Sequence, residues 1–134
     1  MSAFVKLTPH SIEVYPESAF VGLDKFNPYA WVADSVDKNE ALASFPSEGI
    51  ARITTQTIEI APLLGIPMFA TTYDEATGIP NDLHPNTRLI VSLPMQSMAK
   101  ASEHPMADQM VVPYRVVRSS ADGSVVLGCM GFTY

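Results

Sequence analysis

The chain has 134 residues, of which 47% are hydrophobic and 16% are charged, and its formal net charge is −6. This length and composition are typical of one globular domain with its own core, and they exclude a disordered chain. The acidic balance, without any cluster of Lys and Arg, argues against a nucleic-acid partner. So few charges also indicate that protein partners, in a homo-oligomer or a larger assembly, cover part of the surface.

Nothing in the sequence directs the chain to a membrane or out of the cell. No apolar run approaches the roughly 18 residues that a membrane helix needs, and residues 1–6 lack the basic start and apolar stretch of a signal peptide. Cys129 is the only cysteine, so no intrachain disulfide can form. We therefore expect a protein of the cytoplasm, neither secreted nor membrane-bound.

Eleven prolines and seven glycines divide the chain into short pieces, which favours strands over long helices. Two extended runs are predicted at residues 4–7 and 12–15, on either side of a bend that contains Pro9. Residues 17–48 show no period and predict a long excursion, whose aromatic rings anchor it on the body or on a neighbour. Deleting residues 19–44 is therefore expected to leave a folded body. The aromatic residues predicted to form an interface are Phe20, Phe26, Tyr29, Trp31, Phe45, Phe132 and Tyr134.

The middle of the chain predicts a hairpin. Residues 50–60 are rich in Thr and Ile and end in an alternation of polar and apolar residues, which predicts a strand with one wet face. Residues 62–65 form the turn and residues 66–73 the returning strand, with Pro67 near its start. Residues 74–86 are a turn-rich connection.

The last third of the chain predicts one helix and a second hairpin. Residues 89–91 are an apolar strand, and Ser92 can cap a short helix that has Pro94 in its first turn and ends before Pro105. Residues 110–117 and 125–130 predict a hairpin around a turn that contains Asp-Gly. We therefore expect one α+β domain over residues 1–134, made mainly of antiparallel β hairpins with one short helix and a long aromatic-containing loop.

The sequence contains no complete catalytic or metal-binding motif. The three histidines form no HxH or HExxH spacing, so we expect no metal and no cofactor. Cys129 has no partner histidine in its own segment and is predicted to be a buried hydrophobe. Ser92 lacks the glycines of a nucleophile elbow. We therefore expect no enzyme, and a small hydrolase that uses His10 is the least favoured alternative.

Five polar residues remain candidates for ligand binding. His10 is either a turn residue or a ligand contact. The strand arginines either pair with nearby carboxylates and carbonyls or converge on an anionic ligand; they are Arg52, Arg88, Arg115 and Arg118. Both alternatives stay open at this point.

Several short segments, taken in order, resemble a family of small uncharacterised proteins of tailed bacteriophages and prophages. The first is the N-terminal Leu7-Thr8-Pro9-His10, and residues 49–53, 65–67, 89–92, 111–113 and 127–129 follow. The resemblance spans about two thirds of the chain, and residues 17–48 and 130–134 depart from it. It implies a phage-related setting, in a virion or in the cytoplasm of the host, but no activity and no catalytic residue.

Two non-enzymatic functions fit that setting. One is a structural or accessory protein, such as a capsid decoration or another virion component, that acts through protein contacts in many copies. The other is a cytoplasmic anti-defence sponge, a homo-oligomer that binds a host nucleotide signal. The sponge requires the four arginines to converge on one pocket, with Tyr73 or Tyr114 stacking on the base.

Overall fold

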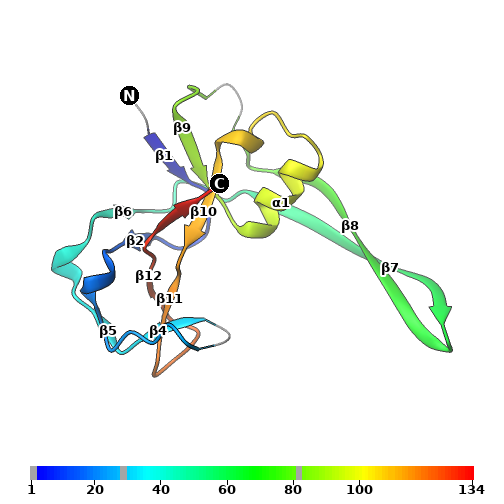
Figure 1. Ribbon diagram of the computed structural model, residues 1–134. Helices are drawn as coiled ribbons and strands as arrows, with labels where there is room; N and C mark the ends of the chain where they lie inside the picture. The colour runs from blue at the N-terminus through cyan, green and yellow to red at the C-terminus, as the bar shows by residue number, and fades with distance from the viewer. Residues whose placement is uncertain (1–2, 28–29, 81–82) are drawn as a thin grey trace.

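The computed structural model describes residues 3–27, 30–80 and 83–134 and shows a β-rich chain with one α-helix (Figure 1). The strands are β1 (Ala3–Lys6), β2 (Ile12–Val14), β3 (Phe20–Val21), β4 (Trp31–Ala33), β5 (Ser35–Val36), β6 (Ala43–Phe45), β7 (Arg52–Leu63), β8 (Ile66–Thr77), β9 (Thr87–Ile90), β10 (Met110–Tyr114), β11 (Val117–Ser119), β12 (Val126–Gly128) and β13 (Gly131–Thr133). Helix α1 spans Leu93–Ala101, and 3-10 helices are η1 (Glu17–Ala19), η2 (Lys38–Glu40) and η3 (Ala107–Gln109).

A four-stranded sheet in the order β1-β9-β10-β13 carries the first half of the core. Strands β1 and β10 both run parallel to β9, and β13 runs antiparallel to β10. Most of the other pairings in the described chain are antiparallel, as expected, but the centre of this sheet is not. A pattern read along the chain cannot reveal that β1 pairs with β9, because the two strands are far apart in sequence.

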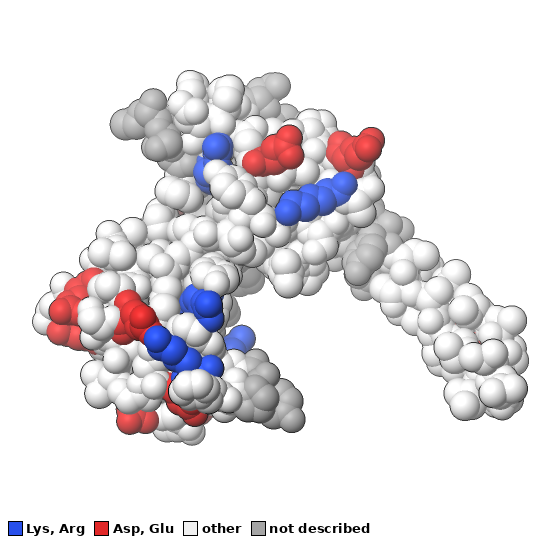
Figure 2. All heavy atoms as spheres, viewed as in Figure 1, with Lys and Arg blue, Asp and Glu red and all other residues white. Residues whose placement is uncertain are grey.

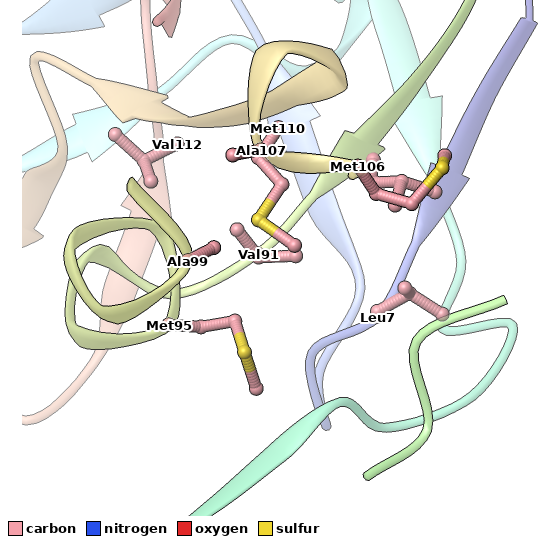
Figure 3. Packing of buried hydrophobic residues seen from close by; sticks show 9 residues of the cluster. Leu7, Val91, Met95, Ala99, Met106, Ala107, Met110 and Val112 are labelled. Atoms are coloured by element: carbon pink, nitrogen blue, oxygen red, sulfur yellow. The ribbon is translucent and has the colours of Figure 1, made fainter. Parts of the chain in front are cut away.

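Helix α1 covers this sheet and forms as predicted. The Ser92 hydroxyl accepts a hydrogen bond from the Met95 N–H at 3.4 Å, and Pro94 occupies the first turn, where its missing N–H is tolerated. The helix ends at Ala101, before Pro105. Its buried face packs in one apolar cluster with side chains of β1, β9 and β10 and of the segments next to them (Figure 3), namely Leu7, Leu89, Val91, Met95, Ala99, Met106, Ala107, Met110 and Val112.

The second half of the body contains the segment that was expected to be a loop. Residues of this segment form β3 to β6 together with η1 and η2, so the predicted long aromatic loop at residues 17–48 is wrong. Strand β6 pairs with β2, β5 with β3, and β4 with β11. Strands of two or three residues are too short to show a period, and these depend on non-local partners. The cluster they bury comprises Tyr15, Ala19, Phe20, Ala33 and Val117.

The predicted strand at residues 110–117 is divided at Arg115, whose φ is +56°. A residue other than glycine in this left-handed region costs roughly 1–2 kcal/mol, and here it lets the chain leave the first sheet after β10. Strand β11 then joins a three-stranded sheet in the order β12-β11-β4. The predicted second hairpin is therefore confirmed for β11 and β12 alone.

Candidate protein interaction surface

Strands β7 and β8 form a two-stranded antiparallel ribbon that projects from the rest of the molecule (Figure 1). We call residues 52–77 the arm and the rest of the chain the body. At the base of the arm, Ile53 and Ala76 pack against the core cluster of α1. Gly78 has φ +80° there, and a Cβ at this position would collide with the carbonyl group of Ile50. The base is thus held firmly on the body.

We call residues 56–69 the outer arm, and none of their side chains is buried. Every residue from Gln56 to Phe69 is exposed. The predicted hairpin is confirmed, but both of its faces are wet from Gln56 to Phe69, because no third strand or helix of the described chain covers either one there. A hairpin of two strands is marginally stable in water without such cover. The outer part of the arm therefore gains nothing from the core.

The register of the two strands divides the arm into two different faces. Ile58 lies opposite Ala70, and Ile60 lies opposite Met68. Cross-strand partners share a face of the ribbon, so these four residues form what we call the apolar face. The other face is mixed, since Glu59 lies opposite Phe69 there. The alternation of polar and apolar residues thus places apolar side chains on one face of the ribbon, and the body does not cover that face.

The tip of the arm is apolar and strained. Leu64 and Gly65 form its turn, with φ angles of +52° and +78°. Two left-handed residues are typical of a tight hairpin turn, in which Asn-Gly is the common pair. Leucine is disfavoured in this region, and Leu64 is nevertheless 93% exposed. The tip therefore combines a costly backbone conformation with a bulky apolar side chain in open solvent, a combination that makes it a candidate contact site.

Between residues 53 and 73 the arm is also almost without charge. Glu59 is the only charged residue between residues 53 and 73. Figure 2 shows no Lys, Arg, Asp or Glu on the visible face of the arm, whereas both signs of charge lie over the body. Seven large apolar side chains are exposed on the arm, and together they leave roughly several hundred Å² of apolar surface in water. They are Ile58, Ile60, Leu63, Leu64, Ile66, Met68 and Phe69.

Three of the four predicted ligand-binding arginines make separate local contacts, namely Arg88, Arg115 and Arg118. Arg88 donates from Nε to the Tyr134 hydroxyl at 3.0 Å, and Arg118 donates from Nη1 to the Gly123 carbonyl at 3.1 Å. Arg52 lies at the base of the arm on β7. Within residues 3–27, 30–80 and 83–134, no two of the four share a contacted residue. The structure does not bring them to a common pocket.

Arg115 has a different environment from the other arginines. Its guanidinium lies 4.2 Å from the ring centre of Trp31 and 4.9 Å from that of Tyr114. Lys25 approaches Trp31 as well, at 5.5 Å from the ring centre. Stacking of this kind is worth about 0.5–1 kcal/mol at an exposed site. It fixes the side chain at the point where the chain changes sheets.

His10 and Cys129 lie in different environments. His10 is exposed in the bend between β1 and β2. The Cys129 thiol is buried, as predicted, and burial raises its pKa above the ordinary value. A thiol with a raised pKa is a poor nucleophile. In the described ranges, no group of three or more His, Cys, Asp or Glu side chains is placed to hold a metal ion.

The aromatic residues predicted to form an interface have several different environments. Phe20 is buried against Tyr15, with ring centres 5.7 Å apart. Phe45 and Phe132 pack on each other at 5.5 Å and on Phe4. Trp31 is half-buried beneath Arg115. Phe26 and Tyr134 are 94% and 65% exposed, and Tyr29 lies outside the described residues.

An open groove of about 430 Å³ lies beyond the C-terminal end of α1. Basic, acidic and apolar side chains line it together, so it selects no one class of ligand. The lining residues are Lys100, Glu103, His104, Pro105, Ala107 and Asp108.

The exposed apolar tip of the arm is the feature that the sequence analysis did not predict. A signal was present in Pro62-Leu63-Leu64-Gly65, because hairpin turns normally carry Asn, Asp or Ser, and two leucines in a turn require another explanation. Most of the aromatic residues that were predicted to form an interface lie within residues 17–48 instead.

No helix in the described part of the chain is long and apolar enough to cross a membrane. No protein-family model, curated protein or solved structure matches this chain.

Proposed function

We propose that this protein is a non-enzymatic structural or accessory component of a bacteriophage-type assembly, such as a capsid decoration, and that the arm makes its main protein contacts. The observation that carries the proposal is the unbroken exposure of residues Gln56 to Phe69. Exposed strands with apolar side chains and free edges favour association. The phage setting rests on the resemblance described above.

A protein partner suits the arm better than a lipid surface does. Segments that lie at a membrane interface carry Lys or Arg for the headgroups and Trp or Tyr at the boundary. From Gln56 to Phe69 the sequence contains none of these four residue types. An uncharged apolar ribbon instead matches the depletion of charge at the centre of protein interfaces.

The arrangement of the arginines does not favour the nucleotide sponge. A phosphate clamp needs at least two cationic groups directed at one anion. Arg88 and Arg118 already donate to Tyr134 and to the Gly123 carbonyl, and Arg115 is stacked on Trp31. The protein-contact function therefore agrees better with this geometry.

The test uses a variant that lacks only the outer arm. Gln56 lies opposite Thr72, so replacing residues 57–71 with Asn-Gly closes the ribbon with a tight turn. Wild-type and arm-excised chains are produced in phage-infected cells, and purified virions are analysed by quantitative mass spectrometry. We expect wild-type protein in stoichiometric amounts and loss of the excised variant from the particles.

Two results would count against the proposal. Equal incorporation of both chains would show that the arm is not the contact element. A wild-type protein that is absent from virions and carries a nucleotide-sized adduct in native mass spectrometry would favour the sponge. Circular dichroism of the excised variant serves as the control for folding of the body.

A further inference from the structure

We propose that the apolar face of the arm packs against the apolar face of a second copy of this chain, in a two-fold symmetric pair. The inference rests on the proposed function, since it names the first partner of the arm. The face is formed by Ile58, Ile60, Met68 and Ala70, and the tip adds Leu63, Leu64 and Ile66.

Charge favours a second copy as the occupant. A two-fold contact brings the same surface of both copies together, so a charged residue near the symmetry axis would face the same charge on the other copy. The apolar face carries no charge, and its neighbours Gln56 and Thr72 are also uncharged. Glu59 lies on the opposite face and stays in water. The contact therefore joins two copies without opposing like charges.

The length of the arm removes the main obstacle to pairing, which is repulsion between two acidic bodies of net negative charge. Residues 56–64 extend for roughly 30 Å at about 3.3 Å per residue. Charges are screened within about 8 Å at physiological ionic strength. Arms that meet near their tips thus hold the two bodies beyond the range of their repulsion.

The exposed area is adequate for a specific pair. Ile58, Ile60 and Met68 are 44%, 45% and 37% exposed on the apolar face. The tip residues Leu63 and Leu64 are more exposed, at 60% and 93%. Together these side chains supply a large part of the roughly 800 Å² that each partner buries in a standard interface. Pairing also adds a second layer to a ribbon that is marginal alone.

The test is analytical ultracentrifugation of the full chain over a range of concentrations in 0.15 M salt. Ile60→Lys and Ile60→Glu each place a charge on the apolar face, and Thr57→Lys places one on the opposite face as the matched control. We expect a wild-type dimer and a dimer of the Thr57→Lys variant. Each Ile60 variant alone is expected to dimerise about a hundredfold or more weakly, because like charges then face each other.

A mixture of the two Ile60 variants distinguishes face-to-face pairing from other contacts. If the two faces meet, Lys on one copy opposes Glu on the other, and dimers return in the mixture alone. Failure of the mixture to recover would overturn the two-fold arrangement, as would a monomeric wild type at every concentration. Flotation of the monomeric wild type with phosphatidylcholine and phosphatidylglycerol vesicles would identify a lipid surface instead.

These outcomes remain separate from those of the virion experiment. A monomeric wild type that still needs its arm to enter virions would overturn the pairing and leave the proposed function standing. A dimer broken by the Ile60 variants, with normal incorporation of the arm-excised chain, would do the reverse. Residue 60 is exposed in the single chain, so at low protein concentration, where arms do not pair, the thermal unfolding of each variant should match that of wild type.

Discussion

Leu89 in the body and Leu64 in the arm have the same side chain in opposite surroundings. Leu89 has no exposed surface and packs with residues of α1 and β10, whereas Leu64 is 93% exposed at the tip of a free ribbon. The body buries two clusters of apolar side chains. The outer arm has none of these contacts, so its order depends on its own turn and on whatever covers it. The difference agrees with the proposed function, in which the body is a scaffold and the arm makes the protein contacts.

The largest expected effect comes from removing a segment that sequence reasoning treated as dispensable. Deletion of residues 19–44 removes β4 and β5 and the buried residues Phe20 and Ala33. Small domains have only about 5–15 kcal/mol of stability, so we now expect this deletion to unfold the chain. The arm-excised variant, by contrast, should keep a folded body. Near-ultraviolet circular dichroism and amide exchange of the two variants compare them directly.

If the deletion of residues 19–44 left native amide protection in β9 and β10, the segment would be an appendage after all. Residues 19–44 would then not be needed for folding of the body.

A smaller effect is expected from the same substitution at two leucines. Leu89→Ala should lower the free energy of unfolding by about 2–5 kcal/mol, because it leaves a cavity in the core. Leu64→Ala should change it by less than about 0.5 kcal/mol in the monomer, as is usual at an exposed site. Urea denaturation at low protein concentration, where arms do not pair, measures both values. Equal losses would mean that the tip is part of the core.

The smallest expected effect is a pH dependence of the folding stability, caused by Lys6 in the body. Lys6 is only 2% exposed, its ammonium group donates to Thr8, and burial lowers its pKa below the ordinary 10.5. Between the lowered value and 10.5 the unfolded chain binds more protons than the folded one, so stability rises with pH in that window. Below the window the cost of burying the charge is fully present.

We therefore expect wild type to gain stability relative to Lys6→Met as the pH rises through that window. Lys100→Met, at an exposed lysine, is the control and should track wild type. Denaturant titrations at several pH values above neutral provide the measurement. Parallel curves for wild type and Lys6→Met would contradict the burial of a charged amine.

Local chemistry made some elements predictable. Ser92 and Pro94 placed the start of α1 because a cap and a first-turn proline act within one turn of the chain. The alternation at residues 57–60 predicted β7, and the Pro-Leu-Leu-Gly turn placed its return. These signals need no partner elsewhere in the sequence, and the helix start and the hairpin were confirmed. The turn is shorter than predicted, because β7 runs to Leu63, and β8 continues to Thr77, past the predicted end at residue 73.

Other features depended on partners that are distant in the chain. Strand β4 is stabilised by its pairing with β11, and strand β1 is stabilised by its pairing with β9. Residues 17–48 contain no pattern that reveals such partners, and their aromatic residues looked like a loop. The sequence predicted that the arginines lie on or beside strands. It did not predict that they lie apart, because the position of each arginine depends on where its own strand or turn lies in the fold.

The sequence by itself determined a β-rich chain with one capped helix, an alternating hairpin and an acidic balance, since propensity, capping and charge are local properties. Only the tertiary structure decided that the apolar face of that hairpin remains uncovered. Burial depends on which elements pack together, and the body closes its two clusters without the outer arm. Ile58 and Ile60, whose alternation predicts a strand with one buried face, therefore lie on an exposed apolar surface.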